Sequence, residues 1–366
     1  MPPRRQRNIG RRTRLTRSLY NHRVRQTEEE RTQRLDANRV TLSQCKINLL
    51  YDSSDESDTE ITIRRRRLFR PRLEYEFLES TLEYNERFRL KRDKFILLLN
   101  LLSPILENET NRSHSLTVQQ QLLITLRWLG TGTTYHAVGD LHGVSKATVC
   151  RLARKHGSSG IQILRHERHA VSLRLFDGTL IKLDAPKEHE EAYFDRHGNH
   201  SISCMVVCGP DLQFYYSYAN WPGSTHDSRV LRNSCLFRRM ENGWRPIQNG
   251  IILGDSAYPL KDWLIPPLSN NRRFLNTHKS TRRVVENAIG ILKEKFPVLN
   301  YLRMSPEMAS DVFNCAVTLC NFSRTEEDEN FRITYPSDSD NDEEVNQTIA
   351  DSRGQARLQT LLNYFN

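Results

Sequence analysis

The sequence predicts a protein in two parts, an all-α region followed by an α/β fold in which helices cover a sheet. In the first part, apolar residues recur at helical spacing in the runs Phe95–Leu102 and Val118–Leu129. In the second part, from about Ala170 to Phe322, short runs rich in Val, Ile, Tyr and Phe alternate with turns and with longer helical patterns. We expect boundaries at residues 71–165 for the helical domain and 170–323 for the α/β domain.

The charge balance favours a polyanionic partner. The chain has 366 residues, with 54 Lys and Arg against 44 Asp and Glu, a net charge of +10 and a pI near 9.3. Nucleic acid is the partner that such a balance indicates, although solubility alone would also explain it. A mean hydropathy of −0.65 with 37% hydrophobic residues indicates that part of the chain is unfolded.

Compartment and membrane association follow from the cysteines and the apolar runs. The seven cysteines are scattered, so we expect no disulfide framework and a reducing compartment, the cytosol or the nucleus. Apolar runs stay short of the ~20 residues that span a bilayer. The basic start of the chain lacks the apolar segment of a secretory signal. The sequence therefore predicts no membrane association.

Both ends of the chain are compositionally biased. Residues 1–70 form an Arg-rich arm that we expect to be disordered, and it contains the run Arg64–Arg67. Such a run acts as a nuclear import signal, as a phosphate-binding arm, or only as a solvated charge run, and the sequence leaves these alternatives open. Residues 324–366 form an acidic, Ser-rich tail in which a short helix is expected near Ala350–Tyr364.

A helix-turn-helix is predicted at the end of the helical domain. A short helix at Tyr135–Leu141 is expected to pack through Val138 and Leu141. A tight turn at His142-Gly143 follows, and Ser145 caps a second helix.

The second helix of this motif offers side chains to DNA. Lys146, Thr148 and Arg151 are expected on its open side, whereas Val149 and Leu152 pack inward. A plain helical hairpin that packs on the neighbouring domain is the alternative reading of the same pattern.

Strands and helices can be placed along the α/β domain. The expected strands are Val171–Leu183, His200–Cys208, Leu212–Ala219 and a buried strand at Gly250–Asp255. The expected helices are Ser228–Arg239, Thr281–Phe296 and Pro306–Phe322. Cys204 and Cys208 share one face of a strand, so a buried pair is favoured over a zinc site.

Four carboxylates stand out by their positions. Asp177 falls within the first strand, Asp255 ends the buried strand, Asp227 begins a helix, and Glu286 lies on the long helix. An acid beside an apolar strand costs several kcal/mol of desolvation unless a partner compensates. Mg²⁺ or Mn²⁺ would compensate, because these ions prefer hard oxygen ligands. Taken singly, Asp177 and Asp255 could equally be turn or capping residues.

The helical period places Glu286. The apolar stripe of its helix consists of Val285, Ala288, Ile289, Leu292 and Phe296. Glu286 lies on the flank of this stripe, on the same side as Arg282 and Lys293, where a carboxylate can reach strand-end acids while the bases face phosphates. An ordinary charged helix face explains Glu286 equally well when it is considered alone.

Four blocks of the sequence resemble the PIF/Harbinger transposases and the nucleases derived from them. These blocks are Phe176–Thr179, Trp221–Ser234, Leu253–Leu260 and Val285–Lys293, in the order found in the family. The resemblance implies an RNase H-like fold, with a mixed sheet flanked by helices, and a preceding helix-turn-helix region.

The resemblance also implies a chemistry and a site. Asp177, Asp255 and Glu286 would be the catalytic and metal-binding acids, with Asp227 as a fourth metal ligand. From their position on the helix, independently of the resemblance, Arg282 and Lys293 are expected to hold DNA phosphates. The sequence departs from the family pattern at Leu180, where a His is usual, and at Arg174, where apolar residues are more usual.

Three hypotheses follow. The first is a nuclear, divalent-metal-dependent DNA endonuclease or strand transferase, and the four intact acids favour it. The second is a DNA- or chromatin-binding protein that has lost the reaction, which the two departures favour. The third is a nuclear scaffold that acts through its charged tails. The resemblance further implies a separate Myb-like partner protein, and oligomerisation is left open.

Overall fold

The computed structural model describes residues 71–72, 81–108, 114–164, 173–245, 250–324 and 351–365. These residues belong to one compact unit, Leu68–Asn366. The basic arm predicted for residues 1–70, with Arg64–Arg67, and the acidic stretch of residues 325–350 lie outside the described residues.

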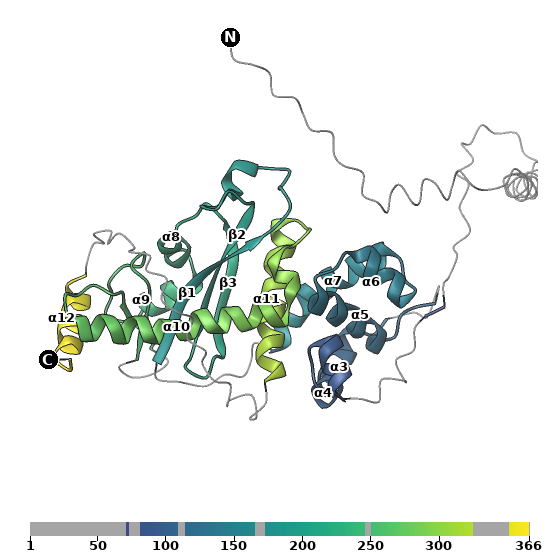
Figure 1. The fold of residues 1–366 in the computed structure, drawn as a ribbon, viewed down its shortest axis with the longest axis horizontal. Helices are drawn as coiled ribbons and strands as arrows, with labels where there is room; N and C mark the ends of the chain where they lie inside the picture. Colours follow the sequence, from purple (N-terminus) through teal and green to yellow (C-terminus); the bar gives the residue numbers. More distant parts are fainter. Residues whose placement is uncertain are drawn as a thin grey trace, which may run out of the picture. The chain divides into compact units, whose positions relative to one another are not determined.

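The first part of the described chain is helical, as predicted (Figure 1). Its helices are α3 (Thr81–Phe88), α4 (Arg92–Leu106), α5 (Val118–Thr131), α6 (Tyr135–His142) and α7 (Lys146–Leu164). The Thr117 side chain and Gln120 form a reciprocal capping box at the start of α5. Gly143 ends α6 in the left-handed conformation with φ of 66°, which makes the tight turn before α7.

The two helices and the tight turn that were predicted to form a helix-turn-helix are present, with one correction. Ser145 caps α7, because its Oγ accepts the N–H of Thr148 at 3.2 Å, and both Val149 and Leu152 are buried. The prediction that Leu141 packs inward is wrong, since this side chain is 43% exposed. His142 is buried instead, because it lies four residues after the buried Val138 and therefore on the same helix face.

The second part contains a five-stranded mixed sheet in the order β3-β2-β1-β4-β5. The strands are β1 (Leu173–Lys182), β2 (Ser201–Cys208), β3 (Phe214–Pro222), β4 (Ile251–Leu253) and β5 (Leu264–Ile265). The pairs β1–β2 and β2–β3 are antiparallel, whereas β1–β4 and β4–β5 are parallel. This arrangement with flanking helices is RNase H-like, as the sequence predicted.

Helices cover both faces of the sheet. Along β2, Cys204, Val206 and Cys208 join a core shared with α10 (Arg272–Lys295) and α11 (Pro306–Ser323). The alternate residues Met205 and Val207 join a second core with α8 (Asp227–Arg232) and α9 (Cys235–Glu241). The strand β2 is therefore buried on both faces, and the predicted buried Cys204–Cys208 pair is confirmed.

Three boundaries differ from the sequence predictions. The single helix expected at Ser228–Arg239 is two helices, because the buried Ser234 accepts the N–H of Phe237 at 3.0 Å and starts α9. The helix α10 begins at Arg272, nine residues before the predicted Thr281, since Asn271 caps it there. The two-residue strand β5 was missed because it is too short to show a period.

The remaining elements are short. Two 3₁₀ turns, η1 (Glu190–Tyr193) and η2 (Pro297–Asn300), precede β2 and α11, and the predicted C-terminal helix is α12 (Ser352–Leu362). The cysteines of the described chain are free thiols. None of the helices in the described ranges is long and apolar enough to cross a membrane.

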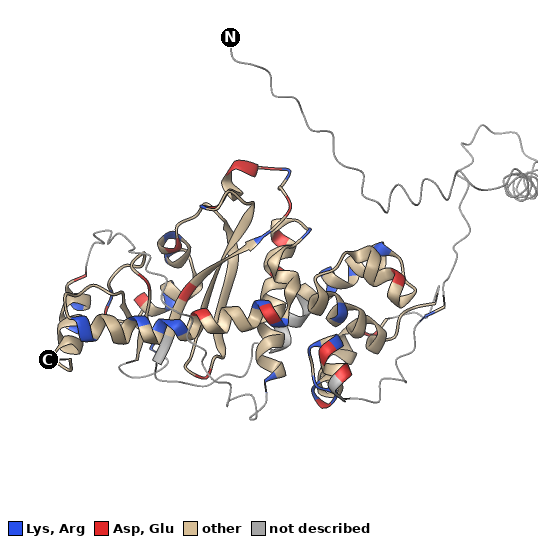
Figure 2. Cartoon of the chain, viewed as in Figure 1, with Lys and Arg blue, Asp and Glu red and all other residues tan. Residues whose placement is uncertain are grey.

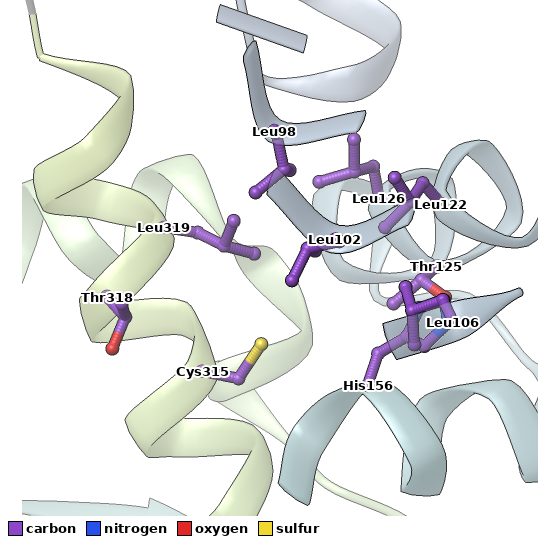
Figure 3. Close-up of a pocket in the computed structure, with 10 residues that line it drawn as sticks. All are labelled: Leu98, Leu102, Leu106, Leu122, Thr125, Leu126, His156, Cys315, Thr318 and Leu319. Atoms are coloured by element: carbon purple, nitrogen blue, oxygen red, sulfur yellow. The ribbon is translucent and has the colours of Figure 1, made fainter. Parts of the chain in front are cut away.

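A small cavity of about 30 Å³ lies between the helical part and α11 (Figure 3). Its walls are mostly aliphatic, including Leu102 and Leu319, and Cys315 and His156 also line it. None of the four predicted acids lines this cavity. It is therefore a packing feature of the junction of α4, α5 and α7 with α11.

A buried hydrogen bond fixes His156 in this junction. The Thr125 hydroxyl lies 2.9 Å from the Gln121 carbonyl oxygen, to which it donates, and 2.8 Å from His156 Nδ1. Because its proton is used on Gln121, Thr125 must accept from His156 Nδ1–H, which leaves Nε2 without a proton. Burial, followed by the charge of Lys155, lowers the pKa of His156 to about 4. The imidazole is therefore neutral at pH 7.

Removing the partner of this imidazole should destabilise the protein. In the variant Thr125→Val, the buried Nδ1–H of His156 loses its acceptor, so we expect the free energy of unfolding to fall by about 1–3 kcal/mol. Urea denaturation of the full chain measures it. The matched control is Thr131→Val, which removes a hydroxyl bonded in the same way to the carbonyl four residues earlier but at a less buried site. A control loss as large as that of Thr125→Val would contradict the account.

Candidate active site

The parallel pairing of β1 with β4 brings two predicted acids together. In this pairing Leu173 lies opposite Ile251 and Leu175 lies opposite Leu253. Asp177 and Asp255 each lie two residues beyond the last pair of this ladder, and the charge of Asp255 acts on Asp177. Asp177 Oδ1 accepts the N–H of Gly178 at 2.9 Å, and Asp255 Oδ1 accepts the N–H of Ala257 at 2.8 Å. Both carboxylates are thus anchored to backbone at one end of the sheet.

Asp227 approaches the same point from the other side of β1. A Cβ atom added to Gly178 would lie 2.8 Å from Asp227 Oδ1. Glycine at this position therefore lets the Asp227 carboxylate rest against the strand directly after Asp177. His226 is the N-cap residue of α8 by its backbone, but its side chain makes no capping hydrogen bond.

The helix α10 brings Glu286 and Arg282 to the acids. Val285, Ala288 and Leu292 are buried against the sheet, which confirms the predicted stripe and leaves Glu286 on its flank. The Arg282 guanidinium lies 3.4 Å from Asp177 Oδ1 and 3.9 Å from Glu286 Oε1. Arg282 and Asp177 are largely buried, with side-chain exposures of 17% and 13%, whereas Glu286 is 54% exposed. One guanidinium therefore bridges a sheet acid and a helix acid.

The acids perturb one another. Burial is the main cause that raises the pKa of Asp177 from 3.8 to about 7; Arg282 lowers it, while Asp255 and Glu286 raise it further. Burial, followed by the charge of Asp255, raises the pKa of Asp227 to about 6. These carboxylates are therefore costly to ionise in the absence of additional positive charge.

Polar atoms without partners surround this group. The Tyr258 hydroxyl is fully buried and has no hydrogen-bond partner among the described residues. Burial raises the pKa of Tyr258 well above its usual value, and the charges of Asp227 and Asp255 act in the same direction. The Tyr258 ring packs edge to face on Phe176, the neighbour of Asp177, with centroids 4.5 Å apart. Arg282 Nε and Asn287 Nδ2 likewise have no described partner.

The donor chemistry suits a divalent cation, although the side chains are not gathered around one. No group of three or more His, Cys, Asp or Glu side chains in the described ranges is arranged to hold a metal ion. The Arg282 guanidinium lies between Asp177 and Glu286. Buried carboxylate oxygens that raise one another's pKa are nevertheless the ligands that Mg²⁺ or Mn²⁺ prefers.

The other predicted site residues lie apart from the acids. Lys293 is seven residues beyond Glu286 on α10, and its ammonium donates to the Leu180 carbonyl oxygen at 3.2 Å. Leu180 itself pairs with Ser203 in the sheet. The backbone of Arg174 pairs with Ile252, and its side chain lies outside the described part of the structure.

The candidate DNA-contacting residues of the helix-turn-helix form a separate group on α7. Lys146 and Arg151 are exposed. Thr148 Oγ1 lies 3.0 Å from Ser145 Oγ and accepts from Arg151 at 3.4 Å.

Sequence reasoning missed the neutral residues of the site. Tyr258 and Asn287 appear in the sequence analysis only within the blocks Leu253–Leu260 and Val285–Lys293, without a role of their own. Both residues fall inside blocks that carry the family resemblance. The signal that could have found them is that each is a polar residue close in sequence to a predicted acid. Their burial without partners depends on tertiary packing and could not be predicted from a single sequence.

The geometry agrees with a comparison of the chain with protein families. Residues 176–321 match the family described as DDE superfamily endonuclease. These residues form a DDE superfamily endonuclease domain. The matched range of the endonuclease domain begins beside Asp177 and contains Asp227, Asp255 and Glu286.

Curated relatives extend the similarity beyond the endonuclease domain. The protein named "Putative nuclease HARBI1" of Mus musculus is 27% identical over 262 residues, covering 63% of this chain and 74% of the relative. Its Homo sapiens counterpart is 27% identical over 256 residues, covering 62% and 73%. "Protein ALP1-like" of Arabidopsis thaliana is 24% identical over 263 residues, covering 60% and 64%. The chain is thus a distant relative of Harbinger-derived proteins.

The raised pKa of Asp177 predicts how stability depends on pH. The folded state holds a proton on Asp177 up to about pH 7, whereas the unfolded state releases it near 3.8, so stability falls as the pH rises between these values. Without divalent cations, we expect Asp177→Asn to be more stable than the wild type at pH 8, by on the order of 3 kcal/mol. This advantage should shrink toward pH 5.

Chemical denaturation in the presence of a chelator, at pH 5 and pH 8, measures this difference. The control Asp184→Asn removes an exposed carboxylate just beyond the end of β1 that accepts a hydrogen bond from Tyr301, and it should not stabilise the protein at pH 8. A wild type that is the more stable protein at pH 8 would show that Arg282 already compensates Asp177 fully.

Proposed function

We propose that this chain is a divalent-metal-dependent DNA endonuclease of the transposase type. Its reaction is the hydrolysis of a phosphodiester bond, in which a water oxygen bonds to phosphorus while the bond to the leaving 3′ oxygen breaks and a 3′-hydroxyl forms. In a strand transfer, that hydroxyl would attack a second DNA at the same site. Asp177, Asp255 and Glu286 are the proposed catalytic acids, with Asp227 as a fourth metal ligand.

One observation carries this proposal. Four acids, from β1, the loop after β4, α8 and α10, act electrostatically on one another, and in the described part of the chain the Arg282 guanidinium bridges Asp177 and Glu286. Ordinary stabilisation does not explain this arrangement, since buried like charges oppose folding. Functional sites are where such perturbed carboxylates gather.

The proposed roles of the acids differ because some of their side chains are held in place and one is able to move. Asp177 lies within β1 and Asp255 lies two residues after β4, and a backbone N–H group holds each carboxylate, so they keep their positions. Glu286 is half exposed on a helix, so its side chain is able to swing toward them. A bound Mg²⁺ or Mn²⁺ would activate water and stabilise charge on the phosphate oxygens. Arg282, released from Asp177, would then be free to hold a phosphate.

A second candidate function, DNA binding without cleavage, is supported by a separate observation. The bridge from Arg282 to Asp177 and Glu286 also suits a protein that binds DNA without cutting it, because the guanidinium neutralises two of the acids. DNA would then contact Lys146, Thr148 and Arg151 of the helix-turn-helix. A nuclear location and a Myb-like partner fit either function and remain proposals.

The nuclease proposal predicts a specific loss of activity. Asp177→Asn, Asp255→Asn and Glu286→Gln should each reduce Mg²⁺- or Mn²⁺-dependent cleavage of duplex DNA by at least about 100-fold, because each removes an anionic oxygen ligand. The assay follows a labelled duplex incubated with purified full-length protein, with the folding of each variant checked by circular dichroism.

The matched control is Glu294→Gln, an exposed acid eight residues beyond Glu286 on the same helix, which should cleave like the wild type. Cleavage that survives all three substitutions would place the activity elsewhere. DNA binding without cleavage by the wild type would select the second function.

A further inference from the structure

The N-terminal half of α10 carries positive charge only. Between Arg272 and Val285 the helix contains five Lys or Arg residues and no Asp or Glu, and Glu286 is its first acid. Figure 2 shows this concentration of basic residues along α10. Arg282 belongs to the acid site, and the remaining cations are Arg272, Arg273, Lys279 and Arg283.

These cations lie away from the core. Phe274 and His278 are buried among the packed residues of α10, whereas Arg272, Arg273 and Lys279 are exposed. None of these three exposed cations forms an ion pair with a carboxylate in the described part of the chain. Unpaired cations on a rigid helix repel one another, so the fold itself gains nothing from their concentration.

The spacing along the helix suits a regular polyanion. At 1.5 Å per residue, Arg272 and Lys279 lie about 10 Å apart and Arg272 lies about 21 Å from Glu286. Each strand of a DNA duplex advances about 3.4 Å per phosphate. The charged face therefore spans roughly six nucleotide steps and ends at the acid site.

The helix α12 adds to this face. Its end packs on the start of α10 through the rings of Phe365 and Phe274, whose centroids are 5.7 Å apart (Figure 1). Arg353 of α12 is exposed. The acid that precedes α12, Asp351, lies 3.9 Å from the ammonium of Lys261. The described C-terminal segment thus packs on the start of α10 and carries an exposed cation at the other end of α12.

We propose that the exposed face of α10 from Arg272 to Arg283, with α12 beside it, binds the phosphate backbone of duplex DNA. This surface would deliver one strand to the acids around Asp177. The inference rests on the proposed nuclease function, which names DNA as the substrate. It assigns substrate binding to residues of the endonuclease domain itself, independently of the helix-turn-helix.

The test replaces the three unpaired cations. The triple variant Arg272→Gln, Arg273→Gln, Lys279→Gln should bind a labelled duplex of about 30 base pairs at least about 10-fold more weakly at physiological salt. The slope of log affinity against log salt should fall by about 2 to 3, since each lost phosphate contact removes nearly one unit. Fluorescence anisotropy in a chelator measures both quantities without cleavage.

The matched control removes the same charge from three scattered sites. Arg92→Gln, Lys187→Gln, Arg303→Gln takes exposed cations from α4, a loop and the region before α11, and its affinity should stay within about twofold of wild type. Equal losses in the two triple variants would overturn the proposal, because net charge alone would then explain binding. Tighter binding of an RNA duplex of the same sequence would also overturn it.

The result of this DNA-binding test can be interpreted independently of the result of the nuclease assay. Cleavage by the wild type, together with undiminished DNA binding by the α10 variant, would reject this surface and leave the nuclease standing. Weakened binding by the α10 variant, with no cleavage by the wild type, would retain the surface and reject the nuclease.

Discussion

The contact of Arg282 with Asp177 and Glu286 is the interaction on which the rest of the site depends. Asp177 belongs to the sheet, Glu286 belongs to α10, and a single guanidinium lies within 4 Å of both. The guanidinium lowers the pKa of Asp177 and so offsets part of the rise that burial and the neighbouring acids cause. The Arg282 contact therefore stabilises the acids in the fold, and a cation that binds Asp177 would have to displace it.

The fold supplies the positions from which these charges meet. The parallel pairing of β1 with β4 fixes Asp177 and Asp255 side by side, and the lack of a side chain at Gly178 admits Asp227. The buried stripe of α10 determines which of its residues face the sheet and which face solvent. Since cations occupy the solvent side from Arg272 onward, one helix serves both the proposed acid site and the proposed DNA surface.

Periodicity predicted the elements that bury a repeating apolar face. The strands β1 to β4, the helix-turn-helix and the stripe containing Val285 and Leu292 were all visible in the sequence. Features governed by single residues were harder to predict: Ser234 divides a helix, and Asn271 starts α10 earlier than its apolar pattern does. The bridge through Arg282 and the orphaned hydroxyl of Tyr258 depend on contacts across long sequence separations, which no local pattern encodes.

The central claim is that the acids around Asp177 form a divalent-cation site that Arg282 occupies in the metal-free protein. Titration calorimetry of Mn²⁺ into the full chain tests it most directly, beside the double variant Asp177→Asn, Asp255→Asn. The account predicts saturable binding to the wild type that disappears in the double variant. Equal Mn²⁺ binding by both proteins, or none by the wild type, would contradict it.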